Sequence, residues 1–592
     1  MGGAERIRVN RQIPSSYPDR TLKRGRFSLK LIKMGVANYR AFKALGPIDP
    51  TEIEAQLHWV DLSADIVLVA GENNAGKTSI LSAYRDFRGS KTSLSQNDFY
   101  NNDASNPVIM ELVFQAETEN ELDDEKTAKW FSADKKQARV RKVWNAPDST
   151  FEKYSFDPET SSWIEKGFGG FDSILQNRLP EPVHIRPDMS SEELRSELNK
   201  LFKEIVSRYI SGSDTAKSIN ALLEKLSEEI EDDDYIKSVA DRVGNVARDI
   251  FPDIEVKFEN PASNKGVLAL LEKQTSVELE LSNSPKLNVT RHGQGSQRVL
   301  ILSALSSLSS ELSALSQKSK TPPKEAGGKI IQIEEPELYL SPTATRRMKQ
   351  LLYKLASQEK IQVMACTHSP VMIDFSRPKQ TIVRVEKGES GSKVFQSNPG
   401  NWGKDQTETL KLMYQWNPAL SEAIFANKVI LVEGETEFAS ITRLIEIMET
   451  EKPELDIHII DCKGKGSIQH YQRLLRDMGR RYLVVHDTDV KYAPNDPTVQ
   501  SRWDENETIW EEVALARTHN IDAIGFAFNP DFESEHKYEA QKPKMLNAMN
   551  FIQNSLESGS LEEMPIYRLY MCIKEWASPY KNIETIRSTC AP

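Results

Sequence analysis

The sequence predicts a multidomain α/β protein with a first domain built around a glycine-rich loop, an inserted helical segment and a separate C-terminal domain that contains a parallel β-sheet. The chain has 592 residues, more than one hydrophobic core holds, so several domains of roughly 100 to 200 residues are expected. Near the N-terminus a strand, a glycine-rich loop and a helix follow one another. In the C-terminal third, strands alternate with amphipathic helices, the pattern of a parallel sheet.

The composition is that of a soluble globular protein, with 39% hydrophobic and 28% charged residues. The sequence contains no run of about 18 apolar residues, so no membrane insertion is expected. The cysteines Cys366, Cys462, Cys572 and Cys590 form no C-x-x-C pair, which favours a reduced, cytoplasmic protein. The net charge of -11 still allows a confined basic groove for nucleic acid.

Two segments are predicted to lie outside regular structure. The basic segment 1–27 lacks the apolar core of a secretory signal, so we expect a flexible arm, with a nucleic-acid-binding arm as the weaker alternative. The segment Lys387 to Thr409 is rich in Gly, Ser, Asn and Lys. It is predicted to be a loop that links the first domain to the C-terminal one.

A phosphate-binding loop is the strongest motif of the first domain. The strand Ile66 to Val69 runs into Gly71 to Thr78, which fits G-x-x-x-x-G-K-[ST], and a helix follows. The N–H groups of such a loop point at phosphate oxygens. Lys77 adds a cation for the outer phosphates, and the Thr78 hydroxyl is placed for magnesium. ATP and Mg²⁺ are therefore expected here.

Two later strands end in residues that suit the same nucleotide. The strand before Glu334 and Glu335 delivers one carboxylate to hold the magnesium through water and a second to position the attacking water. We expect both from a strand that neighbours the one before the phosphate loop. The strand Ile361 to Ala365 leads to His368, which is placed to sense the γ-phosphate.

Two further segments complete the predicted first domain. Gly293 to Gln297 opens a helix and suggests a second anion-binding helix end, although serine-rich helix starts are common. The segments Glu192 to Ile210 and Ala216 to Ile230 carry apolar residues at helical spacing. Two such inserted helices favour a packing or dimerisation arm. DNA binding by them is the alternative, and the acidic run at 229–234 counts against it.

The C-terminal third is predicted to be a parallel sheet with carboxylates at its carboxyl edge. The strand Val429 to Val432 delivers Glu433, and Glu437 follows on a helix start; a later strand, from Tyr482, delivers Asp487 and Asp489. Alternate residues of an extended segment point the same way, so both aspartates would face Glu433. Carboxylates without His or Cys favour Mg²⁺ or Mn²⁺ over zinc. The loop Lys463 to Ser467 either approaches a phosphate or only turns the chain.

The motifs of the first domain resemble the ABC-type ATPase head of the SMC and RecF class, in that family's order. Walker B ends in Glu334 where many of these proteins have aspartate, and the signature Gly293 to Gln297 is a variant form. By this resemblance the residues that bind the nucleotide and its metal are Arg40, Asn73, Gly76, Lys77, Thr78, Gly295, Ser296, Glu334 and His368, with Glu335 catalytic. ABC heads complete their sites between two protomers, so a homodimer or higher homo-oligomer is implied.

The form Glu-Glu-Pro-Glu at 334–337, followed by the C-terminal carboxylates, resembles the OLD (overcoming lysogenisation defect) nucleases, including those of the Gabija type. That family joins the ABC-type head to a C-terminal Toprim domain. The histidines usual just after this motif are replaced by Tyr339 and Ser341, so no role is carried to them. The matching metal-binding and catalytic positions are Glu433, Glu437, Asp487, Asp489 and Glu533, with Lys542 as the catalytic lysine.

The resemblance implies an ATP-regulated, divalent-metal-dependent DNA endonuclease of bacterial anti-phage defence. Some branches work with a helicase-like or reverse-transcriptase (retron) partner, which the sequence leaves open. One alternative is a RecF- or SMC-like repair ATPase whose Toprim module is not catalytic; another is a Toprim topoisomerase, which requires a nucleophilic tyrosine. The expected boundaries are 1–27 for the arm, 28–180 and 256–410 for the halves of the ATPase, 181–255 for the helical dimerisation insert, and 411–592 for the Toprim nuclease domain.

Overall fold

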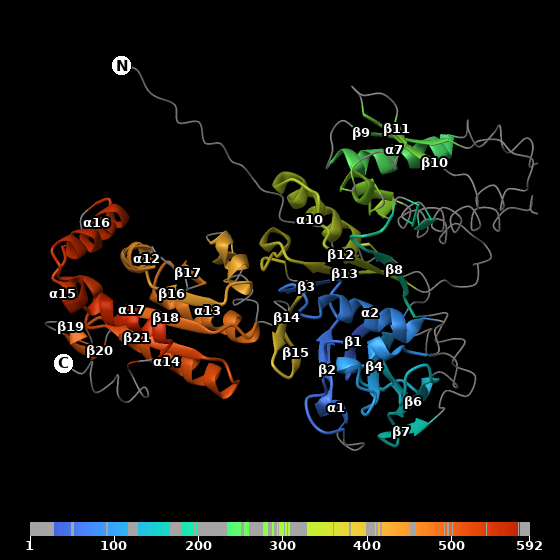
Figure 1. Cartoon of the computed structure of the whole chain (residues 1–592), viewed down its shortest axis with the longest axis horizontal. Coiled ribbons are helices and arrows are strands. Elements are labelled where there is room, and N and C mark those ends of the chain that lie inside the picture. Colours follow the sequence, from blue (N-terminus) through green and yellow to red (C-terminus); the bar gives the residue numbers. More distant parts are fainter. Residues whose placement is uncertain are drawn as a thin grey trace, which may run out of the picture.

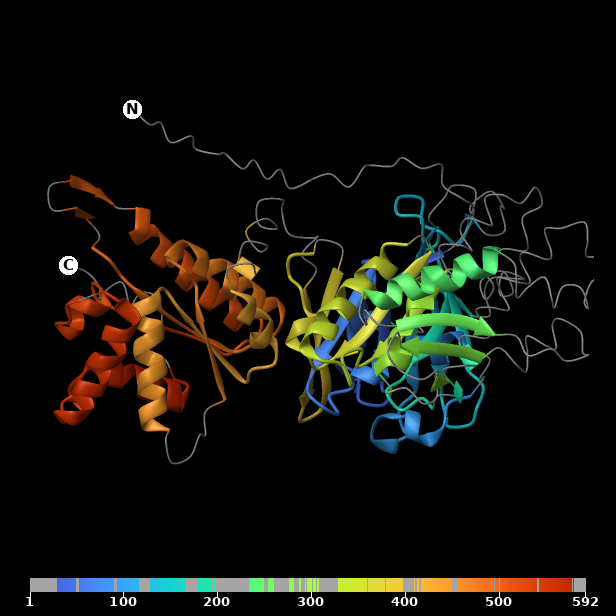
Figure 2. The same ribbon diagram turned by 90° about the horizontal axis from the view of Figure 1, so that it is seen from above.

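The computed structural model describes residues 29–48, 53–89, 93–116, 128–165, 179–190, 234–249, 254–259, 276–281, 295–300, 328–358, 360–377, 380–397, 417–449, 456–490, 501–539 and 542–577, with a few shorter pieces between them. These residues form two lobes, seen side by side in Figure 1 and from above in Figure 2. The N-terminal lobe extends to β15, and the C-terminal lobe begins near β16. No helix among these residues has both the length and the apolar character needed to cross a bilayer.

The N-terminal lobe is organised around a six-stranded sheet in the order β15-β14-β3-β13-β12-β8. All neighbours are parallel except β15, which forms an antiparallel hairpin with β14. The strands are β3 (Ile66–Gly71), β8 (Glu181–Ile185), β12 (Lys329–Glu334), β13 (Ile361–Thr367), β14 (Gln380–Gly388) and β15 (Gly391–Ser397).

Two sequence predictions are corrected by this sheet. The segment that begins at Lys387 is not simply a loop, because β14 continues to Gly388 and β15 follows at once. Its polar composition is that of an edge strand with one side in water. The carboxylate strand β12 is not a neighbour of β3 either, since β13 lies between them. Glu334 therefore reaches the phosphate loop across the end of β13.

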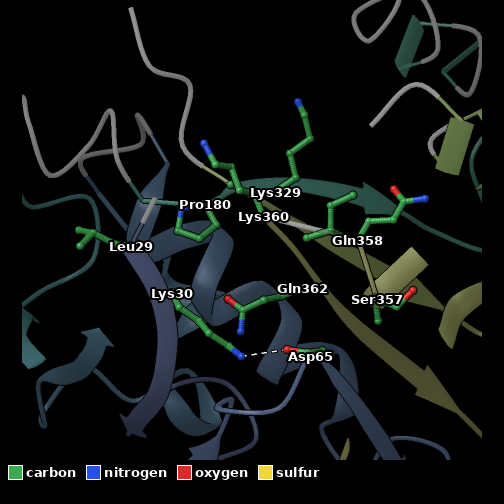
Figure 3. Close-up of a pocket in the computed structure, with 12 residues that line it drawn as sticks. Leu29, Lys30, Asp65, Pro180, Lys329, Ser357, Gln358, Lys360 and Gln362 are labelled. Carbon is green, nitrogen blue, oxygen red and sulfur yellow. Dashed lines mark hydrogen bonds and ion pairs between the residues drawn. The ribbon is translucent and has the colours of Figure 1, made fainter. Parts of the chain in front are cut away.

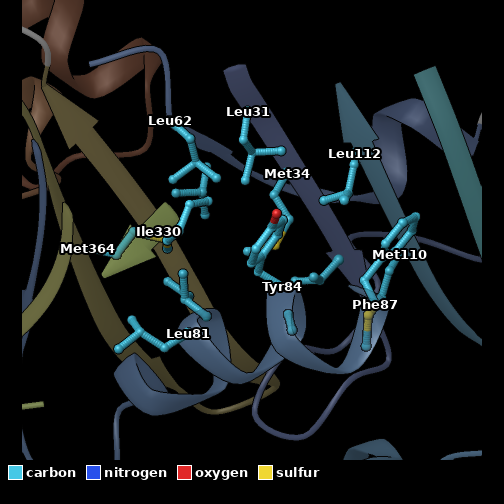
Figure 4. Close-up of a cluster of buried hydrophobic side chains, with 14 of the residues drawn as sticks. Leu31, Met34, Leu62, Leu81, Tyr84, Phe87, Met110, Leu112, Ile330 and Met364 are labelled. Atoms are coloured by element: carbon cyan, nitrogen blue, oxygen red, sulfur yellow. The ribbon is translucent and has the colours of Figure 1, made fainter. Parts of the chain in front are cut away.

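Helices and a second sheet cover the two faces of the parallel sheet. On one face lies α2 (Lys77–Arg88), which is packed in turn against an antiparallel sheet in the order β2-β1-β4-β5-β6-β7. Figure 4 shows this core, where Tyr84 and Phe87 of α2 meet Met34 of β1 and Met110 of β4. On the opposite face lies α10 (Pro342–Ala356). Strands of the antiparallel sheet are β1 (Leu29–Ala37), β2 (His58–Asp61), β4 (Val108–Ala116), β5 (Gln137–Trp144), β6 (Glu152–Asp157) and β7 (Ser162–Glu165).

A small antiparallel sheet accompanies helix α7 (Asp234–Arg248) beyond the parallel sheet. It consists of β9 (Ile254–Glu259), β10 (Ser276–Leu281) and β11 (Leu287–Asn288). The predicted helices at 192–210 and 216–230 lie almost entirely outside the described residues. Short elements elsewhere are helix α1 (Ile53–Gln56) and 3-10 helices at Gln96–Asp98, Tyr100–Asn102, Pro370–Met372, Pro418–Ile424 and Leu561–Glu563.

The C-terminal lobe contains the predicted parallel sheet, in the order β17-β16-β18-β21. Its strands are β16 (Lys428–Val432), β17 (Ile457–Asp461), β18 (Tyr482–Asp487) and β21 (Ala523–Phe528). Helices α13 (Lys465–Asp477) and α14 (Ser501–Thr518) pack on one face. The other face is covered by α12 (Glu435–Met448), α15 (Phe532–His536), α16 (Lys544–Glu557) and α17 (Pro565–Glu575). A ribbon of β19 (Tyr492–Ala493) and β20 (Asp496–Val499) projects from it.

One hydrophobic cluster is shared by both lobes. Ala70 of β3 and Ile382 of β14 belong to the same buried cluster as Leu431 of β16 and Leu475 of α13. Figure 1 shows α13 on the side of the C-terminal lobe that faces β14 and β15, and α13 is in contact with β15. The lobes therefore meet through packed side chains and not only through the connecting chain.

Candidate functional site

The loop between β3 and α2 has the backbone that a phosphate-binding loop needs. Gly76 has a φ of 101°, and a Cβ there would lie 2.8 Å from the Cβ of Ala41. At Gly71 a Cβ would lie 2.2 Å from the carbonyl oxygen of Val385. Only glycine fits these two positions. The first turn of α2 then directs its backbone N–H groups at the space above the loop.

Lys77 and Asn73 occupy different positions on this loop. Lys77 is 7% exposed. Its ammonium donates to the carbonyl of Gly71 at 3.0 Å and to that of Glu72 at 2.7 Å. Burial lowers the pKa of Lys77, while nearby carboxylates and the Cys366 thiol oppose the drop. Asn73 lies exposed on the loop. The Lys77 ammonium thus lies above the loop, where the phosphate oxygens of a nucleotide would also bind.

Thr78 and Glu334 are brought together, as their expected roles require. The Thr78 hydroxyl donates to Glu334 Oε2 at 2.8 Å, and His184 Nε2 lies 2.8 Å from Glu334 Oε1. Arg85 donates to His184 Nδ1 at 2.9 Å, so Nε2 carries the proton that Glu334 accepts. Burial acts to raise the pKa of Glu334, but these hydrogen bonds lower it below its ordinary value. Glu334 is therefore ionised at neutral pH.

Sequence reasoning missed His184. It lies on β8, about 150 residues before Glu334, and reaches it because β8 pairs with β12 in parallel register, with His184 opposite Gln332. A lone histidine in a short strand gives no local signal of this role. Only the sheet order brings it to the carboxylate.

Glu335 and His368 face one another beside the loop. His368 Nε2 lies 3.6 Å from Glu335 Oε1, and both side chains are about one-third exposed. Burial lowers the pKa of His368 and the Lys77 charge lowers it further, so the ring is neutral at pH 7. Glu337 fixes the histidine loop, since its Oε1 accepts from the Thr367 hydroxyl at 2.7 Å and from the His368 N–H at 2.9 Å. Sequence reasoning assigned no role to Glu337, the last residue of the Glu-Glu-Pro-Glu motif.

Arg40 and the segment at Gly295 support the site from its sides. Arg40 donates to Asp98 Oδ1 at 2.9 Å and pairs with Asp86 at 3.4 Å, and the neighbouring Ala41 is the residue under Gly76. A Cβ at Gly295 would lie 2.8 Å from the Tyr339 carbonyl oxygen. Ser296 lies in the same turn, with its N–H donating to the Gly293 carbonyl. The Gly295 segment thus packs on the loop after Glu335 within one chain.

A pocket lies at the opposite edge of the parallel sheet. It has a volume of about 170 Å³ and is lined by residues at the starts of β1, β12 and β13, among them Leu29, Lys329 and Ile361. The Lys30–Asp65 ion pair crosses it at 2.9 Å (Figure 3). The phosphate loop follows the carboxyl end of β3, so this pocket is separate from the nucleotide site.

Four carboxylates crowd together at the carboxyl edge of the C-terminal sheet. Glu433 directly follows β16, and its Oε2 accepts from the Asp487 N–H at 3.3 Å. The Thr436 hydroxyl donates to Glu533 Oε1 at 3.4 Å, which ties α15 to the start of α12, where Glu437 is 5% exposed. Glu433, Glu437, Asp487 and Glu533 are close enough to perturb one another electrostatically.

The pKa values record this crowding. Burial raises the pKa of Asp487 to about 9, and the charges of Glu437, Glu433 and Glu533 add to the increase. Burial and the neighbouring carboxylates raise the pKa of Glu437 to about 7. Asp461, at the end of β17, also acts on Glu437 and was missed in the sequence. The sequence feature that could have identified Asp461 is its position at the end of the second strand of the C-terminal lobe.

Asp489 is held differently from the other acids. Strand β18 ends at Asp487, and Asp489 has a φ of 57°, so the alternation of an extended strand does not place it. The expectation that Asp487 and Asp489 point together from one strand is therefore corrected. The Asp489 carboxylate pairs with Lys465, whose side chain is 2% exposed. Lys542 is exposed, and no hydrogen bond or ion pair among the described residues joins it to the acids.

The acid cluster suits a hard divalent cation. Its donors are all carboxylate oxygens, which favour Mg²⁺ or Mn²⁺ over softer metals. Burial and, after it, mutual repulsion raise two of the pKa values, and a cation between the carboxylates would relieve the repulsion. Within the described residues, no three His, Cys, Asp or Glu side chains are already arranged as ligands of one ion. The acids would have to draw together around the cation.

Comparison with protein families divides the chain in the same way. Residues 30–373 match the family described as AAA ATPase domain. Residues 424–489 match the family described as overcoming lysogenization defect protein-like, TOPRIM domain. The first match contains the phosphate loop, Glu334 and His368. The second contains Glu433, Glu437, Asp487 and Asp489.

Two similar proteins extend over most of the chain. The Old nuclease of Escherichia phage P2 is 25% identical over 491 residues, which cover 78% of each chain. Endonuclease GajA of Bacillus cereus (strain VD045) is 22% identical over 487 residues, 80% of this chain and 79% of that one. The OLD nuclease of Thermus scotoductus is 30% identical over 173 residues. Among solved structures, an Smc head domain from Pyrococcus furiosus matches with a TM-score of 0.41 and 11% identity, covering 66% of this chain and all of that one.

Proposed function

Because the chain belongs to the AAA ATPase domain family and carries the TOPRIM domain of the OLD-like nucleases, we propose that it is an ATP-regulated, Mg²⁺- or Mn²⁺-dependent DNA endonuclease. The observation that carries the proposal is the carboxylate cluster at the carboxyl edge of the C-terminal sheet, with Glu433, Glu437, Asp487 and Glu533 in electrostatic contact. Carboxylates are crowded in this way where cations are bound for phosphodiester cleavage.

In this proposal Glu433, Asp487 and Glu533 hold the cation, and Glu437 and Asp489 complete its surroundings. A bound divalent cation supplies activation of water and stabilisation of the leaving oxygen. The chain's own residues orient the carboxylates: the Phe532 N–H donates to Asp487 Oδ1 at 3.0 Å, and the Asp487 N–H holds Glu433. Lys542 is exposed, so it is free to approach the DNA backbone and neutralise charge there.

The N-terminal lobe is proposed to bind and hydrolyse ATP as a control element. Lys77 neutralises the outer phosphates, and Thr78 with Glu334 holds the nucleotide's Mg²⁺. Glu335 positions the attacking water, and His368, neutral beside it at 3.6 Å, senses the γ-phosphate. The Gly295 and Ser296 segment would contact the nucleotide of a second protomer, so the active form is proposed to be at least a homodimer.

The proposed biological setting is cytoplasmic anti-phage defence. The names of the phage P2 and Bacillus cereus relatives are those of nucleases. The proposed DNA substrate and the defence role follow from the resemblance of the chain to the OLD nucleases.

A topoisomerase is the second enzyme that uses Toprim carboxylates, and it needs an exposed nucleophilic tyrosine. Tyr570 is 3% exposed and its hydroxyl donates to Glu449 at 2.9 Å. Tyr567 lies on the same helix, and Tyr580 lies outside the described residues. Its burial and its hydrogen bond make Tyr570 unsuited to be that nucleophile.

The proposal is tested by incubating full-length protein with supercoiled plasmid in Mg²⁺ or Mn²⁺. The parent is expected to nick or linearise the plasmid. Loss of an outer partner of a metal ligand typically costs 10- to 100-fold in activity. Asp487→Asn removes a proposed ligand itself, so it should cut at least about 100-fold more slowly. Glu511→Gln, which removes an exposed carboxylate of α14, is the matched control and should cut like the parent. If Asp487→Asn cuts as fast as Glu511→Gln, the cluster is not the nuclease site. DNA trapped covalently on the protein would instead indicate a topoisomerase.

A further inference from the structure

Helix α13 is held to the N-terminal lobe at its carboxyl end. Arg384 of β14 donates from Nε to the Met478 carbonyl at 2.5 Å and from Nη2 to the Gly479 carbonyl at 2.7 Å. A guanidinium at the end of a helix satisfies carbonyls that lack partners within the helix and opposes the negative end of its dipole. The Arg384 side chain is 2% exposed. Because the charge is buried, these contacts cannot be exchanged for water without cost.

Shape reinforces this attachment. Gly479 has a φ of 63° and ends the helix in the left-handed conformation, where glycine is favoured. A Cβ at Gly479 would lie 2.2 Å from the ring of Phe395 on β15, and the Arg384 guanidinium stacks 4.8 Å from the same ring. Leu474, Leu475 and Met478 also belong to the buried cluster shared by the lobes. The end of α13 is thus packed directly on the β14–β15 hairpin.

The strand that holds α13 also touches the phosphate loop. In the parallel sheet, Arg384 lies opposite Ala70 and Val385 opposite Gly71. The Val385 carbonyl fills the position that a Cβ at Gly71 would need, at 2.2 Å. Glu72 of the loop interacts electrostatically with Arg384, where it opposes the lowering of the arginine pKa by burial. A change in this loop therefore acts on the residue next to Arg384.

The other end of α13 reaches the carboxylates. Lys465 is the first residue of the helix, and its ammonium pairs with the Asp489 carboxylate. The Lys465 side chain is 2% exposed, so water screens the pair little. A helix of this length spans about 20 Å. It connects the β14 contact at one end with Asp489, two residues after Asp487 of the acid cluster, at the other.

We propose that α13 couples the two sites: nucleotide bound at the Gly71 loop shifts β14 against the carboxyl end of α13, and Lys465 at the amino end changes its hold on Asp489. The inference rests on the proposed roles of the two sites and adds the route between them. Lys465 is a positioning residue, because while it neutralises Asp489 that carboxylate offers less charge to a cation. Nucleotide and cation binding are then linked, and the linkage is reciprocal.

The test measures Mn²⁺ binding to the full-length protein by isothermal titration calorimetry, with and without a non-hydrolysable ATP analogue. In the parent the analogue should change the Mn²⁺ Kd at the C-terminal site by about fivefold or more, the lower end of ordinary coupling. In Arg384→Met the change should fall below about twofold, while each ligand alone binds within about twofold of the parent. Arg346→Met, which removes an exposed arginine of α10, should keep the parent's coupling.

Lys465→Met provides an independent readout. Removing the cation beside Asp489 should tighten Mn²⁺ binding and make it insensitive to the analogue, whereas a residue that only supports the fold would weaken it. Lys574→Met, which removes an exposed lysine of α17, is the matched control. If Lys465→Met and Lys574→Met both bind Mn²⁺ more tightly than the parent, the effect comes from the net charge of the protein. That result would contradict the role given to Lys465.

Several outcomes overturn the proposal. It fails if Arg384→Met keeps the parent's shift, or if the analogue leaves the parent's Mn²⁺ Kd unchanged. If Arg384→Met does not fold, Arg384→Lys, which keeps the charge and loses the two-pronged donor, must show reduced coupling. Failure of the nuclease proposal would look different. If the protein cuts no DNA but its coupling disappears in Arg384→Met, the route through α13 is supported and only the proposed nuclease reaction is wrong.

Discussion

Carboxylates at the two sites are tuned in opposite directions by their neighbours. Glu334 accepts hydrogen bonds from Thr78 and His184, and its pKa lies below the ordinary value despite burial. Asp487 is buried among other acids, and its pKa is raised to about 9. Glu334 is therefore ionised and lies beside the Thr78 hydroxyl, where the two can hold a magnesium ion together. Asp487 favours its protonated form, and a bound cation would favour its ionised form.

The acid cluster predicts how metal-free stability depends on pH. An unfolded carboxyl titrates near about 4, whereas Asp487 in the folded protein titrates at about 9 and Glu437 at about 7. Between these values the folded state holds more protons, so this contribution to stability falls as the pH rises. Thermal unfolding without metal should show a midpoint that decreases from pH 6 to pH 9, and Mg²⁺ should raise it more at the higher pH.

Asp487→Asn should flatten both effects, because it removes the carboxyl whose pKa is raised furthest in the folded protein. Glu511→Gln, measured in the same way, should keep the parent's pH slope and its response to Mg²⁺. Equal slopes in the parent and in Asp487→Asn would show that the cluster does not control this dependence.

His184 is predicted to matter for ATP turnover more than for ATP binding. It touches Glu334 at 2.8 Å and is oriented by Arg85. Losing such an orienting partner typically costs 10- to 100-fold. His184→Ala should lower the kcat of ATP hydrolysis by roughly that factor, with a much smaller change in KM. His519→Ala, at an exposed position after α14, is the control. A change confined to KM would show that His184 serves binding.

At the scale of elements, sequence reasoning succeeded where the signal is local. The strand, loop and helix around Gly71 to Thr78 and the parallel order of β16 and β18 follow from periodicity and glycine positions. It failed where the signal is tertiary. The polar hairpin strand β15 looked like a linker because edge strands share the composition of loops.

The candidate sites divide in the same way. Residues adjacent to a motif, such as Glu334 and Glu433, are visible from the strand that precedes them. His184, Asp461 and Lys465 were missed as members of the sites, because their partners are set by sheet order and by the position of α13. The sequence places Asp461 at the end of a strand, but it contains no local pattern that joins any of these three residues to its partner.

Close packing of α14 on β21 gives a test at this scale. A Cβ at Gly525 would lie 2.2 Å from the ring of Trp510, whose indole donates to His486 at 3.0 Å. Gly525→Ala should reduce the free energy of unfolding by about 1–3 kcal/mol, as overpacking does. Gly46→Ala has nothing within 4 Å of the added Cβ and should be close to neutral. Equal unfolding midpoints for the two variants would contradict this packing.

At the scale of the molecule, the shared core makes the two lobes one mechanical unit. Leu475 of α13 is 1% exposed in the cluster that also contains Ala70 of the N-terminal lobe. Truncation of a leucine at such a position typically costs 2–5 kcal/mol. Leu475→Ala should therefore lower the denaturant midpoints of both lobes, followed by probes in each.

Leu515→Ala is the matched control for that experiment, because Leu515 is 40% exposed on α14. Its effect should stay within about 0.5 kcal/mol, as at ordinary surface positions. If Leu475→Ala lowers only the transition of the C-terminal lobe, the lobes unfold independently and the shared core does not couple them.

The central claim is that one site hydrolyses ATP and a separate site cuts DNA under its control. The most direct measurement follows ATP hydrolysis and plasmid cleavage in the same samples of parent, Lys77→Ala and Asp487→Asn. The account predicts that Asp487→Asn hydrolyses ATP and does not cut, whereas Lys77→Ala does not hydrolyse ATP and cuts at a rate that no longer responds to it. Loss of both activities in each variant, or parent-like cleavage by Asp487→Asn, would contradict it.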